Sequence, residues 1–455
     1  MESSAKLPFR IAPLIFAVIL VFSKSPAMTP EPGTSELSLK EIAEIALDNS
    51  PAFLTAQASY KASKLQAENS FAAFFPSLDL TSSLGPQGYS PNTVPASAYS
   101  GSVFSSWTSG TALALTETLW NNGETAKQYQ ISKLTEEQNH LQYLKIKGQV
   151  LLTVLQSYCE WSYSLLQLGF THQYAAELDR QFKLASAQYH QGLKTRSDYL
   201  RFQTQVQRSQ LDLISAEKLV ETSRITLINT IGLSQSEDSN RNRGFKVLEK
   251  PRAPSQSSSW HLDANELIEN RIFSIRRQIS DKEVALIKSR DVPQLFLTAG
   301  AQYGSSYYFQ TGQSWNDNQQ TSWNALLTLK FNFWDMGVRN RNIQIQAEQE
   351  VIAQQDIRNT LLNDQKDLLT FKEDQLQLQR RQEVTTSLVS NEQTNYRQIE
   401  QDYRQGKITY LDLTQALSEV LDAQSKKLRV DFDSLILYSK WKYFKGTLDE
   451  NNLEE

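Results

Sequence analysis

The sequence predicts an α+β fold made of two tandem repeats, each with a pair of strands followed by a long α-helical hairpin. In each half, alternating apolar and polar residues precede a Trp-x-x-Gly turn, and a long proline-free stretch follows it. Three glycines also recur 214 residues later with both intervals unchanged. The six glycines are Gly123, Gly192 and Gly232, then Gly337, Gly406 and Gly446.

Other residues keep the same offset and divide the chain into parts. Trp120, Tyr189, Gln191 and Asp198 recur as Trp334, Tyr403, Gln405 and Asp412, and Pro76 recurs as Pro293 at a slightly different offset. Between the copies, "SQSEDSNRNRGFKVLEKPRAPSQSSSW" is polar and typical of a connector. The expected parts are a signal peptide (1–27), a first repeat (28–233), an equatorial connector (234–262), a second repeat (263–447) and an acidic tail (448–455).

The first residues predict export from the cytoplasm. Lys6 and Arg10 precede the apolar run "IAPLIFAVILVF" and the small residues "SPA", which is the order of a secretory signal peptide. With Cys159 as the single cysteine, the exported chain must fold without disulfides. No later run of 18 apolar residues occurs, so we expect any membrane insertion to use strands.

Composition and motifs argue against nucleic-acid binding and catalysis. The formal net charge of -4 gives no reason to expect a polyanionic partner such as nucleic acid. The four histidines are scattered, and no nucleophile motif or phosphate-binding Gly loop is present, so we predict no catalytic residue, cofactor or metal. Cys159 follows Tyr158 within a heptad-like stretch, which favours a packed thiol.

Two short helices are expected before the first strand pair. Ser38 with Glu41 suits a capping box, and the "NSP" at 49–51 ends one helix and starts another with Pro51 in its first turn. The second helix should end before Pro76.

The strand pairs are expected at about 77–120 and 294–334. In "NALLTLKFNFW", Leu327, Leu329 and Phe331 share one face of the strand, as expected for an apolar face toward lipid. Glu117 is the exception, because it falls on the apolar face near a strand end. Four tryptophans near strand ends are candidate membrane-interface residues: Trp107, Trp120, Trp323 and Trp334. A soluble hairpin with one buried face is the alternative.

The helical hairpins are expected at 124–232 and 338–446. Their first helices, at 1.5 Å per residue, reach roughly 100 Å, and the second helices return along them. Gly192 and Gly406 suit the left-handed position that ends a helix. Thr195 with Asp198, and Thr409 with Asp412, suit capping boxes that start the next helix.

Four strands cannot close a barrel, and open strand edges are not tolerated in lipid, so several chains must contribute. Three chains would give twelve strands, with six hairpins forming a tube whose Gly turns ring the far mouth. The rival interpretation is an exported coiled-coil scaffold of the envelope without a conducting lumen.

The chain resembles the TolC-like outer membrane channel-tunnels of Gram-negative bacteria. The resemblance extends from "LSLKEIAEIALDNSPAF" through "LWNNGETAKQ" and "FWDMGVRNRN" to "YFKGTL". It implies a homotrimer with a 12-stranded β-barrel in outer membrane lipid and a trans-periplasmic α-barrel. It also implies docking to a periplasmic adaptor protein and an inner membrane transporter, as the exit duct of a tripartite efflux pump or a type I secretion system. Such channels carry drugs, proteins, metals or other solutes without chemistry of their own.

The resemblance also assigns roles to the tip residues. The implied adaptor-docking residues are Gly192, Leu193, Thr195, Gly406, Lys407 and Thr409, and the implied entrance or gate residues are Asp412, Asp198, Tyr403, Tyr189 and Lys194. The family often has a small or apolar residue where this chain has Lys407. Ile408 and Gln415 replace the basic and acidic residues that the family uses in its latch.

Three copies of Asp412 at a narrow mouth would attract cations and raise one another's pKa. Capping and gating can coexist at this residue and at Asp198. Tyr189 and Tyr403 are interpreted either as packing residues or as parts of the latch.

Overall fold

The computed structural model describes most of the chain outside the predicted signal peptide and connector. The described residues are 37–88, 105–233, 245–248, 260, 262–263, 266–290, 292–308, 319–332, 334–405 and 407–453. The predicted signal peptide (1–27) and Gly406 lie outside them, as does most of the predicted connector.

The elements follow the order that the sequence predicts: two short helices, two strands and a helical hairpin, then one helix, two strands and a second hairpin. Their bounds are α1 (Leu39–Asn49), α2 (Pro51–Ala72), β1 (Ser77–Gly88), β2 (Ser105–Trp120), α3 (Glu124–His190), α4 (Arg196–Ile231), α6 (Ile268–Ser289), β3 (Gln294–Tyr308), β4 (Gln319–Lys330), α7 (Val338–Arg404), α8 (Tyr410–Lys445) and the 3₁₀ helix η5 (Glu450–Asn452).

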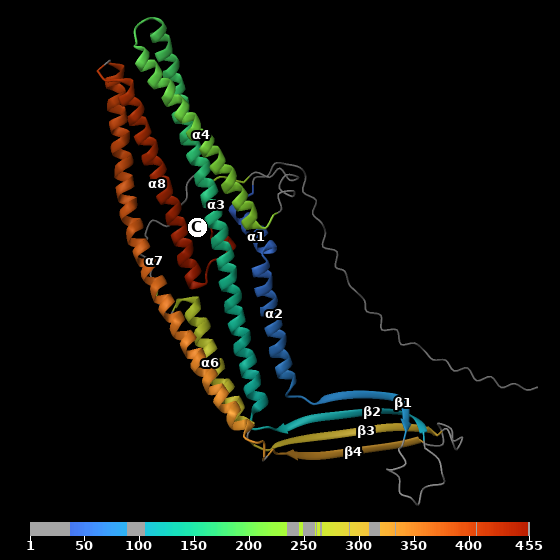
Figure 1. Ribbon diagram of the computed structural model, residues 1–455. Coiled ribbons are helices and arrows are strands. Elements are labelled where there is room, and N and C mark those ends of the chain that lie inside the picture. The colour runs from blue at the N-terminus through green and yellow to red at the C-terminus, as the bar shows by residue number, and fades with distance from the viewer. Residues whose placement is uncertain are drawn as a thin grey trace, which may run out of the picture.

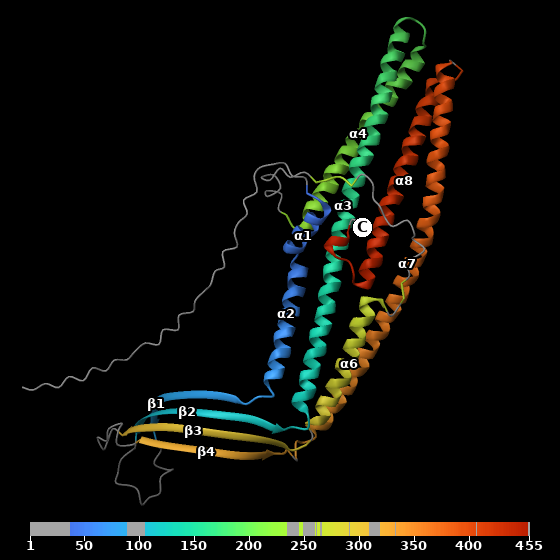
Figure 2. The same ribbon diagram turned by 180° about the vertical axis from the view of Figure 1, so that it is seen from behind.

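The molecule is elongated, with the sheet at one end and both hairpin tips at the other (Figure 1). The strands run across the direction of the long helices. Helix α2 lies along the sheet-proximal part of α3, and α6 lies along the corresponding part of α7, as Figure 2 shows from behind. Within the described ranges, no helix is long and apolar enough to cross a membrane.

The predicted helix starts are confirmed at α1 and α2. Ser38 and Glu41 form a capping box, in which the Ser38 N–H donates to Glu41 Oε2 at 2.8 Å. The Ser50 side chain accepts from the Phe53 N–H, and Pro51 occupies the first turn, where its missing N–H costs no helical hydrogen bond.

The four strands form one antiparallel sheet in the order β1-β2-β3-β4. Its two β-hairpins have the same pairing register at matched positions of the repeat: Leu80 lies opposite Leu113, and Leu297 lies opposite Leu327. These positions differ by 217 residues between β1 and β3 and by 214 residues between β2 and β4.

One face of the sheet is apolar over all four strands, because directly opposed residues and alternate residues along a strand share a face. Its large aliphatic members are Leu78, Leu80, Leu84, Leu113, Leu115, Leu295, Leu297, Leu327 and Leu329. Glu117 lies on this face opposite Leu297, near the end of β2, as the alternation predicts. The opposite face is mainly polar or small.

A hydrophobic core at mid-height joins α1, α3, α4 and α8. Cys159 lies in this core, where burial raises the pKa of its thiol to about 12, in agreement with a packed thiol. Gly232 and Gly446 end α4 and α8 in the left-handed conformation. A Cβ at these positions would lie 2.9 Å from Asn49 Cβ and 2.6 Å from Ile268 Cδ1, respectively, so glycine permits both the conformation and the contact.

Candidate functional site at the helical tips

The tip of the first hairpin is a glycine-terminated turn. Gly192 has φ of 76° and donates its N–H to Tyr189 O at 2.9 Å, while the Leu193 N–H donates to Gln188 O at 2.8 Å. These bonds satisfy carbonyls at the helix end. A Cβ on Gly192 would meet nothing within 4 Å, so only the backbone conformation requires glycine. The turn leaves Leu193 72% exposed.

The tip of the second hairpin has the same turn bond, although Gly406 lies outside the described residues. The Lys407 N–H donates to Asp402 O at 3.0 Å, which matches the bond from Leu193 to Gln188. Lys407 Nζ lies 3.7 Å from Asp402 Oδ1 in an exposed ion pair. The second tip therefore presents a cation where the first presents a leucine.

Both predicted caps are present after the turns. Thr195 Oγ1 accepts from the Asp198 N–H at 3.2 Å and donates to Asp198 Oδ2 at 2.8 Å. Asp412 Oδ2 accepts from the N–H and the Oγ1 of Thr409 at 3.0 and 2.7 Å. Bonds from the threonine side chains hold the pKa of both carboxyl groups below the usual range. In a single copy, each aspartate is therefore a charged helix cap.

The two predicted gate tyrosines pack against neighbouring rings. Tyr189 stacks on Tyr199 with a centroid separation of 5.1 Å, and Tyr403 meets Tyr410 edge-on at 6.0 Å. Lys194 Nζ lies 4.9 Å from the centre of the Phe202 ring. In a single copy these geometries match the packing interpretation of the tyrosines, and a gating role for them stays a prediction.

An aromatic cluster that the sequence analysis missed joins the two hairpins below their tips. Tyr410 of α8 lies 4.7 Å from Phe202 of α4 between ring centres. The buried members of the cluster are Leu178, Val206, Tyr410 and Leu413. Burial raises the pKa of Tyr410, whose hydroxyl has no hydrogen-bond partner among the described residues. Apolar residues at Tyr410, Leu413 and Ala416 were the available signal, since this spacing marks a buried helix face.

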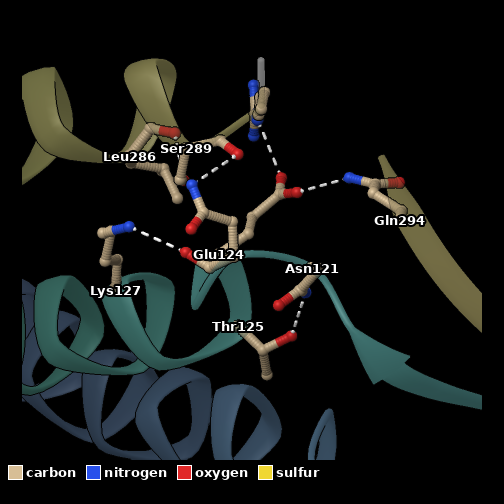
Figure 3. A network of polar contacts seen from close by, with 9 residues as sticks. Asn121, Glu124, Thr125, Lys127, Leu286, Ser289 and Gln294 are labelled. Carbon is tan, nitrogen blue, oxygen red and sulfur yellow. Dashed lines mark hydrogen bonds and ion pairs between the residues drawn. The ribbon is translucent and has the colours of Figure 1, made fainter. Parts of the chain in front are cut away.

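A polar joint, also missed, connects the two repeats where the strands meet the helices (Figure 3). Glu124, the first residue of α3, accepts from Arg290 Nε at 2.7 Å and from Gln294 Nε2 at 2.9 Å. The Asn122 side chain donates to Ser289 O at 3.3 Å. Because the partners are more than 160 residues apart in sequence, local patterns gave no signal for these contacts.

The candidate interface tryptophans do not lie at two common levels of the sheet. Trp107 lies opposite Tyr307, whereas Trp323, 81% exposed, lies opposite Ala301 near the middle of β3. Trp323 therefore lies farther from a strand end than the sequence predicts, because β4 already begins at Gln319. A membrane-interface role for the four tryptophans stays a prediction. Trp120 ends β2, and Trp334 follows β4 on the helix side.

Solved structures with a similar fold include outer membrane proteins and outer membrane channels. VceC of Vibrio cholerae matches with a TM-score of 0.71 at 14% identity, covering 90% of this chain and 96% of that chain. The MtrE channel of Neisseria gonorrhoeae in its open state gives 0.68 at 16% identity, covering 90% of each chain. The CmeC channel of Campylobacter jejuni gives 0.67 at 14% identity, covering 94% of this chain and 92% of that chain. A comparison with curated protein sequences finds no match.

The family model described as outer membrane efflux protein matches residues 42–233 and 274–435, which is more than half of the chain. The chain belongs to the outer membrane efflux protein family. By this membership it is an outer membrane efflux protein rather than an enzyme.

Proposed function

We propose that this chain forms a homotrimeric channel-tunnel, with a 12-stranded barrel in the outer membrane and a helical barrel across the periplasm. One observation supports this most strongly: a four-stranded sheet with one continuous apolar face ends in two edge strands, β1 and β4. In lipid the outward N–H and C=O groups of these edges require partners, and further copies of the sheet supply them.

The helical part supports a duct that ends far from the membrane. Both hairpin tips lie at the opposite end of the molecule from the sheet (Figure 1). The proposed duct is the exit of a tripartite efflux pump or a type I secretion system, in which the tips dock with a periplasmic adaptor that also binds an inner membrane transporter. Exposed Leu193 and Lys407 are the side chains best placed for this contact.

Docking at the tips can be tested with a photo-crosslinking residue at Leu193, and a matched control at exposed Leu65 of α2, far from the tips. We expect crosslinks to a periplasmic adaptor, identified by mass spectrometry, from the tip position and none from the control. Equal capture at both positions would argue against docking through the tip.

Single-channel conductance in planar bilayers tests the channel itself. Wild type is compared with Asp412→Asn, which removes the charge but keeps an oxygen that can accept from Thr409. Asp198→Asn is the matched control in the other hairpin. We expect small cation-selective currents, with selectivity reduced more by Asp412→Asn than by the control, because charge at the narrowest point dominates ion selection.

Two results would contradict parts of this proposal. Equal effects of the two variants would show that Asp412 contributes no more to ion selection than Asp198 does. Folded, membrane-inserted protein that conducts in none of the forms would favour the rival function, an exported coiled-coil scaffold without a lumen.

A further inference from the structure

The tandem repeat makes the contact between the two halves of one chain a template for a contact between two chains. Strands β2 and β3 belong to different repeats and pair over their length. The matched strands are β4 and β1, which are the two edges of the described sheet. If a second copy continues the sheet, its β1 lies beside β4 of the first copy, in the same way that β3 lies beside β2 within one chain.

The template fixes a register because both offsets are known from the structure. Moving β2 residues forward by 214 and β3 residues back by 217 reproduces the β4 and β1 positions. The pair Leu115 and Ala299 then becomes Leu329 and Ser82, and the pair Leu113 and Ala301 becomes Leu327 and Leu84. This register keeps the apolar faces of both copies on one side, which a shift by one residue would not.

At the point where strands meet helices, the residues at the matched positions differ in chemistry from those of the polar joint. Within one chain, Glu124 binds Arg290 and Asn122 binds Ser289 O. The matched residues on the edge after β4 are Val338 and Met336, and those before β1 are Ala73 and Ala72. The side chains of Glu124, Asn122 and Arg290 therefore have apolar residues at the matched positions. Gln294, the second donor to Glu124, is matched by the small polar Ser77.

The solvent exposure of these matched apolar residues agrees with a contact to a second copy. Met336 is 73% exposed in the single chain, and Val338, Ala72 and Ala73 are exposed as well. Met336 also keeps the left-handed backbone of Asn122, with φ of 54° against 52°. Methionine is less suited than asparagine to this conformation. The backbone turn is therefore the same in both repeats, but its left-handed residue is a polar asparagine in the first and an exposed, apolar methionine in the second.

We infer that a second copy of this chain pairs its β1 with β4 in the register that sets Leu329 opposite Ser82, and closes an apolar joint in which Met336 and Val338 meet Ala72 and Ala73 of that copy. The inference rests on the proposed trimer and adds the residues and chemistry of its sheet contact. Copies are joined there by apolar burial, whereas the two repeats of one chain are joined by an ion pair.

Disulfide trapping tests the register in the full chain, exported to the outer membrane with Cys159→Ala as background. Ser82→Cys with Leu329→Cys is the test pair, because residues directly opposed in antiparallel strands have Cα atoms about 4.5 to 5.5 Å apart, within disulfide range. Ser83→Cys with Leu329→Cys is the control, since its side chains leave opposite faces. Ser82→Cys with Leu327→Cys reports a register shifted by two residues.

We expect oxidation to give covalent dimers and trimers from the test pair in large excess over both controls. Met336→Cys with Ala72→Cys should be joined between copies by a short bismaleimide. Preferential linking of either control pair would overturn the inference. So would an absence of linking in all pairs when amine-reactive crosslinking still shows the Cys159→Ala chain to be trimeric. A chain that is not oligomeric by that second measure would instead contradict the proposed function.

Discussion

Helices α3 and α7 are matched elements of the two repeats, and both have 67 residues, yet α3 has more neighbouring helices than α7. Helix α3 packs against α1, α2, α4, α6 and α8, whereas α7 packs mainly against α6 and α8. Among the described side chains of α7, the buried ones are Gln346, Asp364, Phe371 and Leu378. The same architecture therefore holds one helix at the centre of the protomer and leaves the other at its edge.

The residues on corresponding faces follow this difference. Gly148, Leu155 and Ser162 of α3 are buried, whereas the matched Leu362, Leu369 and Leu376 of α7 are exposed. The α7 residues form an apolar stripe with a spacing of seven, which is typical of a seam that packs on another helix. At two of these three positions the edge helix has a leucine where the central helix has Gly148 or Ser162. These leucines lie on a face that lacks a partner in the single chain, as the proposed trimer requires.

The largest expected effect comes from truncating matched leucines. Leu155 is fully buried, while Leu369 is 68% exposed. Leu155→Ala should lower the free energy of unfolding by about 2 to 5 kcal/mol, because it leaves a cavity in the central core. Leu369→Ala should change the unfolding of unassembled chains by less than about 0.5 kcal/mol, and lower the trimer fraction instead.

Chemical denaturation of detergent-solubilised chains, with the oligomeric state measured in parallel, distinguishes the two sites. Equal losses in the unfolding free energy of unassembled Leu155→Ala and Leu369→Ala chains would contradict the assignment of α3 to the centre and α7 to the edge of the protomer.

A smaller effect is expected from exchanging residues between Gly148 and its match, Leu362. A Cβ at Gly148 would lie 3.0 Å from Tyr443 Cδ2. Gly148→Leu should therefore cost about 1 to 3 kcal/mol through overpacking. Leu362→Gly should cost about 1 kcal/mol, from helix propensity alone. The same denaturation measurement compares them, and a Gly148→Leu chain as stable as wild type would show that the α3–α8 contact is loose.

The third prediction concerns Asp364, a carboxylate of α7 that matches apolar Val150 of α3. Asp364 is 5% exposed, and its Oδ2 has no hydrogen-bond partner among the described residues. Burial, followed by the nearby charges of Glu269 and Asp367, raises the pKa of Asp364 to about 6, and Lys145 opposes the shift. Between pH about 4 and about 6 the folded chain holds a proton that the unfolded chain has lost. Stability should therefore fall as pH rises through this window, and remain lowered above it.

Asp364→Asn should raise the free energy of unfolding by about 1 to 2 kcal/mol at pH 7.5, after allowance for solvent screening, and by less than about half of that amount at pH 4.5. Denaturation at both pH values is the measurement, and exposed Asp356→Asn is the control on the same helix. A gain that is equal at both pH values would rule out titration of Asp364 as the cause.

Several features of the fold could be predicted because they depend on neighbours in sequence or on the repeat. The Ser38 and Ser50 caps and the threonine caps of both tips each involve residues three apart. The apolar strand face follows from alternation, and the matched strand registers follow from the 214-residue offset.

The remaining features depend on how distant elements meet. The level of Trp323 is set by its pairing opposite Ala301. The contact of Phe202 with Tyr410 depends on where the two hairpins approach each other, and the bond of Arg290 to Glu124 depends on contact between repeats. Periodicity along the chain contains no information on these encounters, which are fixed by packing of the whole protomer.

The smallest expected effect is at the tips, where α3 and α7 end in matched residues of different character. Lys407→Leu introduces the residue that the first tip has at Leu193, and removes an exposed ion pair of 3.7 Å with Asp402. Exposed pairs contribute about 0 to 1 kcal/mol, and the bond from the residue 407 N–H to Asp402 O is kept. The unfolding free energy should therefore change by less than about 0.5 kcal/mol, with little dependence on salt. A larger loss would show that the second tip is held by its ion pair, unlike the first. If the unfolding free energy is unchanged but cells that produce the Lys407→Leu protein lose export activity, the loss is assigned to the contact between this tip and its partner.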